Sequence, residues 1–169
     1  MPGKKAHSGW NKPMNPHLTA KMQKTDRIMS GRIPARKDYR GPVHVGADLG
    51  TAYTVLMVLD QEYQPIAGAY QFAQVVRDVL VVDFMGAIAL LRKLKAKVEE
   101  DLGFALTSAA SGYPPGVALA EVRATANVLE AAGMQCTGLV DEPTAANNVL
   151  QIRDGVIVDV GGGTTGVAI

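Results

Sequence analysis

The sequence predicts an α/β fold in which a mixed β-sheet is flanked by helices. Three apolar segments with strand periodicity follow one another over residues 43–73, which predicts an antiparallel meander. Helix and strand patterns then alternate from residue 84 onward, as in chains whose strands are joined by covering helices. A strand-like segment at 156–160 leads into a glycine-rich turn. A meander followed by alternating elements indicates a mixed sheet.

The composition indicates one folded core in a reducing compartment. The chain has 169 residues, of which 47% are hydrophobic and 20% are charged, so it can bury one sizeable core. Cys136 is the single cysteine, which excludes an intrachain disulfide and a cysteine zinc cluster. No apolar segment is long enough to cross a bilayer, and residues 1–42 lack the apolar part of a secretory signal. We therefore expect a cytoplasmic protein with no membrane partner.

The formal net charge of +1 conceals a basic N-terminal region. Residues 1–42 contain ten Lys and Arg against two Asp, together with five prolines, a composition that favours a disordered basic arm. Leu18, Met22 and Met29 fall near one helical face, so a short docking helix over 18–29 is the alternative. A solvated tail is favoured over an arm that binds acidic proteins or nucleic acid.

The folded region is predicted to begin at Val43. Asp83 and Asp141 are suited to helix N-caps, and Gly103 and Gly133 to helix ends. In chain order, the predicted elements are strands at 43–48, 53–59 and 65–73, an extended segment at 75–82, a helix at 84–100, a strand at 104–110, a loop at 112–116, a helix from about 118 to 132, a strand at 136–140 and a helix beginning at 141–143.

Two turns of the chain share one chemical design. Residues 48–54 and 159–165 each place Asp-x-Gly and a hydroxyl-rich turn between two strand patterns. Backbone N–H groups and hydroxyls can bind phosphate oxygens, and carboxylates can hold Mg²⁺ through its water ligands. Neither turn is a Walker loop. Gly161, Gly163 and Gly166 formally satisfy a dinucleotide fingerprint, but a strand pattern follows them where a helix is needed, so a Rossmann oxidoreductase ranks last.

Three motifs in this order resemble the superfamily of actin, heat-shock chaperones and sugar kinases, which are two-lobed ATPases. Residues 48–51 resemble its first phosphate motif, 139–146 its first connecting segment, and 159–164 its second phosphate motif. The resemblance covers residues 43–169 and implies a ribonuclease-H-like sheet flanked by helices. It also implies ATP and Mg²⁺ as cofactors.

A closer resemblance is to the ethanolamine-utilisation protein J family, a chaperone-like branch associated with a bacterial microcompartment. It is carried by residues 46–52, 110–115 and 155–167. The resemblance implies a chaperone-like or reactivating factor that binds Mg²⁺-ATP in its full-length form. The implied partners are protein clients such as ethanolamine ammonia-lyase or other microcompartment enzymes, and nucleic acid is not expected.

The superfamily resemblance assigns roles to individual residues. Asp48 and Asp159 would hold the hydrated Mg²⁺, and Glu142 would orient the attacking water. These three acids form the expected catalytic set. Taken alone, Glu142 could equally be an acid that stabilises the start of a helix. The residues expected to contact the β- and γ-phosphates are Gly50, Thr51, Gly161, Gly162, Gly163 and Thr164.

The chain also departs from the superfamily pattern. Gly166 stands where the chaperone motif has a further aspartate, and the second connecting segment and adenosine motif do not follow. We therefore expect residues 1–42 to be an arm, 43–150 to be the first ATPase lobe and 151–169 to begin an incomplete second lobe, with weak or absent ATP turnover. A non-catalytic adaptor and a filament-forming actin-like or pilus-assembly relative are the alternative functions.

Overall fold

The centre of the molecule is a five-stranded mixed sheet in the order β3-β2-β1-β6-β7. The computed structural model describes residues 15–72, 76–77, 80–81 and 83–169. β1, β2 and β3 pair antiparallel, whereas β6 is parallel to β1 and to β7. The fold class predicted from the sequence is confirmed. The strands of this sheet are β1 (His44–Leu49), β2 (Tyr53–Leu59), β3 (Pro65–Phe72), β6 (Ser108–Tyr113) and β7 (Gln135–Asp141).

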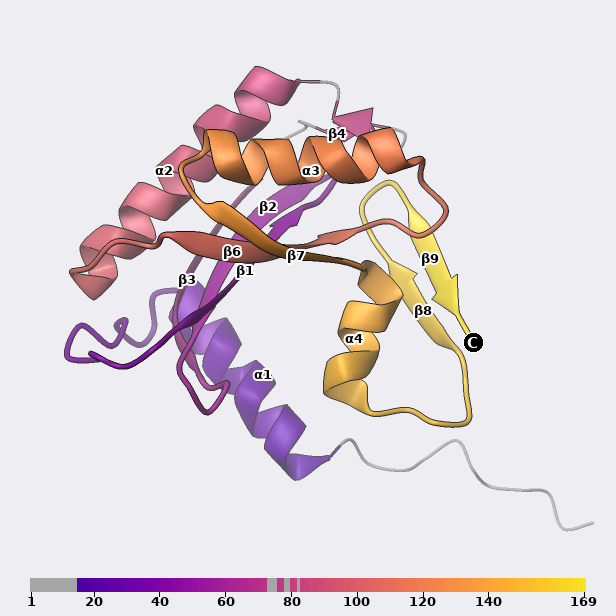
Figure 1. Cartoon of the computed structure of the whole chain (residues 1–169). Helices are drawn as coiled ribbons and strands as arrows, with labels where there is room; N and C mark the ends of the chain where they lie inside the picture. The colour runs from indigo at the N-terminus through magenta and orange to yellow at the C-terminus, as the bar shows by residue number, and fades with distance from the viewer. Residues whose placement is uncertain (1–14, 73–75, 78–79, 82) are drawn as a thin grey trace, which may run out of the picture.

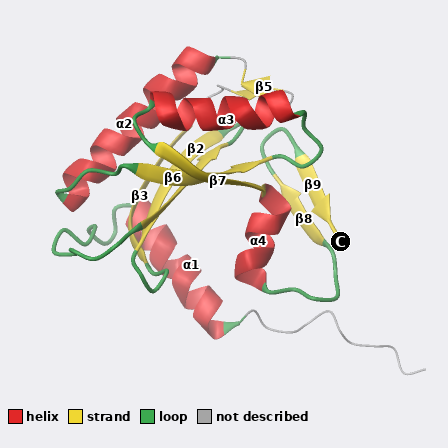
Figure 2. Ribbon diagram, viewed as in Figure 1, coloured by secondary structure: helices red, strands yellow, loops and turns green. Residues whose placement is uncertain are grey.

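Helices cover both faces of the sheet (Figure 1). α2 (Phe84–Leu102) and α3 (Leu119–Ala131) lie on one face, and α1 (Pro16–Met29) and α4 (Glu142–Leu150) lie on the other (Figure 2). The apolar residues of α2 recur every three or four positions, so one stripe of the helix is buried against the sheet. This layer forms the core, whose largest fully buried side chains include Leu56, Val58, Leu91, Val98, Leu102, Leu106, Leu129 and Met134.

The residues predicted to begin and end the helices do so in the structure. The Asp83 carboxylate accepts a hydrogen bond from the Gly86 N–H at 2.7 Å, and α2 ends at Gly103, whose φ is +80°. Gly133 follows α3 with a φ of +82°. At α4 the Asp141 carboxylate accepts from the Thr144 N–H at 3.0 Å. Each N-cap satisfies a backbone donor that would otherwise lack a partner.

The prediction of a disordered arm over residues 1–42 was wrong for residues 15–42, and residues 1–14 lie outside the described part. α1 packs on β3, where Ile28 is only 7% exposed and a Cβ at Gly68 would lie 2.7 Å from the Met29 sulfur. The alternative of a short helix was closer to the structure. Burial against a sheet that is distant in sequence holds this segment, and local composition cannot signal such burial.

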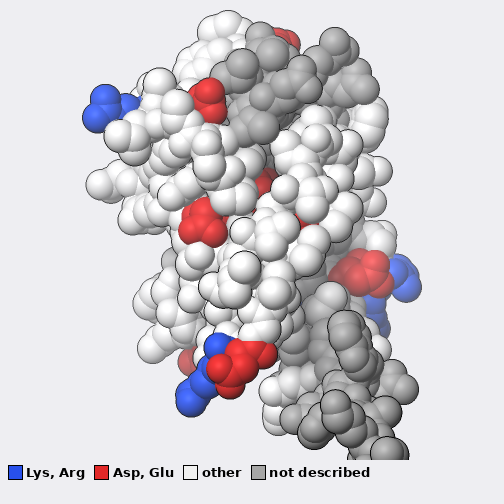
Figure 3. Space-filling model, turned by 90° about the vertical axis from the view of Figure 1, so that its right-hand side faces the viewer, with Lys and Arg blue, Asp and Glu red and all other residues white. Residues whose placement is uncertain are grey.

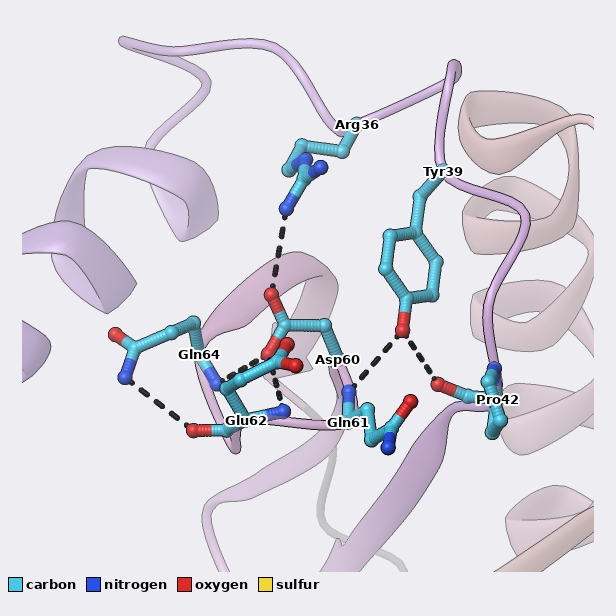
Figure 4. Close-up of polar contacts among 7 residues, drawn as sticks. All are labelled: Arg36, Tyr39, Pro42, Asp60, Gln61, Glu62 and Gln64. Atoms are coloured by element: carbon cyan, nitrogen blue, oxygen red, sulfur yellow. Dashed lines mark hydrogen bonds and ion pairs between the residues drawn. The ribbon is translucent and has the colours of Figure 1, made fainter.

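The segment after α1 is fastened to the turn between β2 and β3 (Figure 4). The Arg36 guanidinium pairs with the Asp60 carboxylate at 3.3 Å, and Asp60 is 3% exposed. The Tyr39 hydroxyl accepts from the Gln61 N–H at 3.1 Å and donates to the Pro42 carbonyl at 2.8 Å. These contacts explain why residues 36–42 follow a defined path despite their basic composition.

Two predicted strand segments need correction. The strand expected at 104–110 is Ser108–Tyr113 in the structure, so it extends into the expected loop at 112–116. Before this strand, the Leu106 N–H donates to the Glu99 carboxylate of α2 at 2.6 Å. The residues just before Ser108 therefore form a connection held against α2 and not a strand. Of the extended segment predicted at 75–82, the described parts are β4 (Val76–Arg77) and β5 (Leu80–Val81), and the rest lies outside the described residues.

The last two strands form a separate antiparallel hairpin beside α4 (Figure 1). They are β8 (Ile157–Val160) and β9 (Thr165–Ala168). Asp159 pairs with Gly166 in the register of the hairpin, and Val158 pairs with Val167. Ile157 and Gly166 are buried, whereas Val158, Val160 and Val167 are exposed. Among the described helices, none combines the length and apolar character needed to cross a membrane.

Candidate functional site

Both Asp-x-Gly turns line one cavity of about 870 Å³. The turn after β1 and the turn between β8 and β9 form one side, and the loop after β6 and the first turns of α3 form another. The cavity therefore lies where β1 and β6 end, at the carboxyl edge of the parallel part of the sheet. The predicted site residues that line it are Asp48, Gly50, Thr51, Glu142, Asp159, Gly161, Gly162 and Thr164.

The two turns touch each other through glycines. A Cβ built on Gly162 would lie 2.6 Å from the Ala52 Cβ, and one on Gly163 would lie 2.7 Å from the Thr51 Cγ2. Both distances are too short for a side chain, so glycine is required for the turns to approach this closely. Gly163 thus belongs to the contact between the turns, although it is not among the residues that line the cavity.

Each turn is also closed within itself. A Cβ on Gly50 would lie 2.8 Å from the Tyr53 carbonyl oxygen. In the second turn, the Gly161 N–H donates to the Thr164 carbonyl at 2.9 Å, which closes the hairpin. Tight turns built from glycine leave backbone N–H groups accessible to an anion, which is the arrangement that phosphate-binding turns use.

Three carboxylates from distant segments meet at the cavity. Asp48 comes from β1, Glu142 from the start of α4 and Asp159 from β8. Desolvation is the largest cause that raises the pKa of Glu142, and together with the negative charges of Asp48 and Asp159 and a hydrogen-bonding interaction with Asp159 it brings the pKa to about 7. The predicted catalytic set is therefore assembled in space, and its role stays a prediction.

Asp48 shows the same crowding of negative charge. Desolvation raises the pKa of Asp48 first, and the nearby charge of Asp159 raises it further. By its accessible surface Asp48 is nevertheless exposed, because the cavity is open to solvent. The contribution from Asp159 shows that its charge is close enough to act on Asp48.

The acids fit a hydrated cation better than a directly coordinated one. Among the described residues, no group of three or more His, Cys, Asp and Glu side chains is arranged to hold a metal ion. Mg²⁺ keeps several waters and is held through one or two carboxylates together with phosphate oxygens. Asp48 and Asp159 beside two glycine turns supply that donor set, and a cation would relieve the repulsion that raises the pKa of Glu142.

Glu142 lies at the start of α4, but it is not the residue that caps the helix. The side chain that caps α4 belongs to Asp141, and Pro143 occupies the first turn of the helix in a buried position. Because Asp141 already satisfies the Thr144 N–H, the Glu142 carboxyl is available to the cavity. It still lies at the positive end of the helix dipole, so the two roles are compatible.

Gly166 stands where the superfamily resemblance led us to expect an aspartate, and its surroundings explain the glycine. It is buried, and a Cβ there would lie 3.1 Å from the Pro143 ring and 3.2 Å from the Pro115 ring. A side chain would have to displace one of these rings. Gly166 therefore allows β9 to pack closely on the loop after β6 and on the start of α4.

Sequence reasoning missed much of the wall opposite the turns. The cavity is also lined by Tyr53 and by the loop and helix that follow β6. The signal that could have found them is the Pro-Pro-Gly loop at 114–116, because loops at the carboxyl ends of parallel strands commonly form binding sites. The lining residues missed from this region are Tyr113, Pro114, Val117, Ala120, Glu121, Ala124 and Thr125.

The charges in view on the hairpin side of the molecule are arranged around this site. Figure 3 shows acidic atoms near the middle of this face, some of them recessed, and Lys and Arg only towards its margins. Of the residues from Gly155 to the end of the sequence, Asp159 alone is charged. The carboxylates therefore face a site that lacks a neighbouring basic side chain among its lining residues.

The sheet order, the covering helices and the paired glycine turns define the ribonuclease-H-like fold of the actin-like ATPases. Solved structures of MreB 5 from Spiroplasma citri share this fold with the chain. The complex with AMPPNP has a TM-score of 0.56 and 20% identity, and the match covers 77% of this chain and 49% of that one. The ADP complex gives 0.54 and 20%, over 75% and 47%. At this identity the likeness shows the fold alone.

The chain belongs to the MreB/Mbl protein family, whose profile matches residues 67–169. The ethanolamine utilization protein EutJ of Salmonella typhimurium is 42% identical over 152 residues, and that of Escherichia coli K12 is 40% identical. The crystal structure of EutJ from Carboxydothermus hydrogenoformans matches with a TM-score of 0.84 and 46% identity, over 90% of this chain and 56% of that one. The resemblance to the ethanolamine-utilisation protein J family is thereby confirmed.

The chain spans about half the length of the curated relatives that it matches. The alignments with the Salmonella and Escherichia proteins cover 90% of this chain and 52% of each relative. Both Asp-x-Gly turns and the start of α4 lie within the chain. The activity and partners of the longer relatives are therefore matters for proposal.

Proposed function

We propose that the cavity between the two turns binds Mg²⁺-ATP through its phosphates. The observation that carries the proposal is the direct contact of Gly162 and Gly163 with Ala52 and Thr51, which brings two sets of backbone N–H groups to one anion site. Asp48 and Asp159 would hold the hydrated ion beside it. Thr51 and Thr164 add hydroxyl groups that can donate to phosphate oxygens.

Glu142 is the group that we propose to act on water. A carboxyl group with a pKa near 7 exchanges its proton at physiological pH, as a general base must. Glu142 shares the cavity with both aspartates, so a water held by its carboxylate would lie beside the bound phosphates. One protein of this fold, MreB 5, has been solved bound to AMPPNP and bound to ADP, which supports a nucleotide as the ligand.

Calorimetry with the complete chain tests the nucleotide proposal. ATP should bind when Mg²⁺ is present and should lose most of its affinity in EDTA, because the two aspartates otherwise repel the phosphates. Tripolyphosphate with Mg²⁺ should also bind, since the proposed contacts are to phosphates. Binding that is unaffected by EDTA, or no binding of either ligand at millimolar concentration, would contradict the proposal.

In the cell, we propose that the protein is a chaperone-like reactivating factor for an enzyme of ethanolamine utilisation in a bacterial microcompartment. The similarity to EutJ proteins supports this context, and ethanolamine ammonia-lyase is the proposed client. Inactivated lyase should regain turnover when incubated with the protein and Mg²⁺-ATP. Recovery that is equal with and without the protein would exclude that client.

A non-catalytic adaptor of the same fold is the second candidate, because an aromatic cluster is exposed on the sheet face next to the cavity. The ring of Tyr53 contacts those of Tyr70 and Phe72 edge-on, at centroid distances of 5.8 and 5.4 Å. The three side chains are 48%, 50% and 60% exposed. Exchanging Tyr70 and Phe72 for serine should abolish binding to the lyase if the adaptor function is right, irrespective of ATP.

A further inference from the structure

We propose that Gly112 is a positioning residue for Glu142: its missing side chain leaves the space on the sheet across which the Glu142 side chain reaches the two aspartates. This inference rests on the proposed function for the role of Glu142 in acting on water. The placement of the Glu142 side chain beside Gly112 is independent of that role. Gly112 lies on β6 and lines the cavity.

The register of the sheet places Gly112 between two of the carboxylates. Ala47 on β1 lies beside Ser111 on β6, so the next residues along these parallel strands are Asp48 and Gly112. On its other side Gly112 pairs with Val140 on β7, two residues before Glu142. A glycine therefore occupies the strand that separates Asp48 from Glu142.

The orientation of β6 at this point is fixed by its preceding residue. Ser111 is 3% exposed, and its hydroxyl donates to the Ala47 carbonyl at 2.9 Å across the two strands. Side chains of successive strand residues point to opposite faces, so the Gly112 hydrogen that replaces a side chain points to the face opposite the Ser111 side chain. A Cβ there would lie 3.3 Å from the Glu142 Cγ.

Backbone conformation does not explain a glycine at this position. Among the glycines that the structure describes, those with positive φ are Gly31, Gly103, Gly116 and Gly133, so Gly112 is not one of them. An alanine or a valine could therefore adopt the same strand conformation. The next nearest atom to the built Cβ is the Val140 carbonyl oxygen at 4.0 Å, an ordinary contact. The contact with Glu142 is the one that a side chain would disturb.

A second glycine on the same sheet provides a matched control. Gly138 lies on β7, where it pairs with Ala110, and nothing lies within 4 Å of a Cβ built on it. Like Gly112 it has no positive φ. Replacing Gly138 by alanine or valine adds the same atoms to a neighbouring strand without touching Glu142.

A double-mutant cycle on unfolding by urea tests the contact. Gly112→Val should raise the unfolding equilibrium constant about tenfold in the native background, as overpacking does, and Gly112→Ala should raise it less. On the Glu142→Ala background, where the Cγ is gone, the Gly112→Val effect should shrink to less than about threefold. Gly138→Val should behave the same in both backgrounds. Equal Gly112→Val effects in the two backgrounds would overturn the inference.

The side-chain resonances of Glu142, recorded at one fixed pH by NMR on carbon-13-labelled chain, separate positioning from mere packing. They should be displaced in Gly112→Ala and unchanged in Gly138→Ala, while the Thr144 amide, which Asp141 caps, keeps its resonance in both variants. Unchanged Glu142 resonances in Gly112→Ala would also overturn the inference. Neither measurement uses nucleotide, so failure of Mg²⁺-ATP to bind would leave both outcomes interpretable.

Discussion

The raised pKa of Glu142 affects both the stability of the fold and the chemistry that this carboxyl group can perform. In the folded chain, desolvation and the charges of Asp48 and Asp159 raise the pKa of Glu142 from 4.5 to about 7. The folded state therefore binds this proton more tightly than the unfolded state does. The stabilisation from this proton is complete below the unfolded-state pKa of 4.5 and is lost as the pH rises through the folded-state pKa of about 7.

The first prediction concerns the pH dependence of stability. Between pH 5.5 and 8 the free energy of unfolding should fall on the order of 1–2 kcal/mol, a range reduced for partial solvent screening. Glu142→Gln resembles the protonated acid, so the variant should lose most of this slope and be the more stable chain at pH 8. Urea titrations that show a native chain more stable at pH 8 would contradict this account.

The second prediction separates stability from ligand binding at Asp159. Asp159→Asn removes a negative charge that raises the pKa of both Asp48 and Glu142, so the ligand-free chain should gain about 0.5–1 kcal/mol of stability. The same variant should bind Mg²⁺-ATP at least about tenfold more weakly, because the hydrated ion loses a carboxylate. Thermal unfolding and calorimetry measure the two effects. The prediction is that Asp159 lowers the stability of the ligand-free chain and strengthens ligand binding. A variant that is less stable and still binds Mg²⁺-ATP normally would contradict it.

At the scale of elements, packing decides where the hairpin lies. Gly166 allows β9 to approach the rings of Pro115 and Pro143, and Gly162 and Gly163 allow the turn between β8 and β9 to touch the turn after β1. The hairpin is not hydrogen-bonded to the central sheet. A two-stranded hairpin is marginal by itself, so we infer that these close contacts hold it.

The third prediction follows from that inference. Gly166→Ala should cost about 1 kcal/mol or more, since the new methyl group must displace a proline ring. The loss should appear as faster amide hydrogen exchange in β8 and β9, while β1 and β2 keep their protection. Gly138→Ala, in open space, is the control. Equal exchange in the two variants would mean that the proline contacts do not hold the hairpin.

The fourth prediction tests whether α1 is part of the fold. Ile28→Ala should destabilise the chain by about 2–4 kcal/mol, because the side chain is buried and the cavity left behind adds to the cost. Met22→Ala, on an exposed side of the same helix, should change stability by less than about 0.5 kcal/mol. Similar small effects at both positions, measured by urea unfolding, would instead indicate the mobile arm predicted from composition.

Elements with strong local signals could be predicted from the sequence. Asp83 and Asp141 mark helix starts by their own side chains, and the apolar periodicity of α2 is complete within the helix. α1 lacks a comparable local signal, because Ile28 is buried where the helix packs on β3, a strand that comes much later in the sequence. The start of β6 was also misplaced, since pairing with β1 and β7 selects Ser108–Tyr113.

For the whole molecule, the candidate site could be predicted only in part. The two Asp-x-Gly turns repeat one local pattern, so their residues were identifiable, and the structure places them in one cavity. The nearness of Glu142 to the two aspartates and the space beside Gly112 depend on distances between separate elements. No local pattern encodes such distances.

The central claim is that the two turns act as one phosphate site. Amide chemical shifts of the complete chain, followed during titration with AMPPNP and Mg²⁺, test this most directly. The account predicts that residues 50–52 and 161–164 shift together, with one shared affinity, and that EDTA reverses both. Shifts confined to one turn, or absent from both while other residues respond, would contradict it.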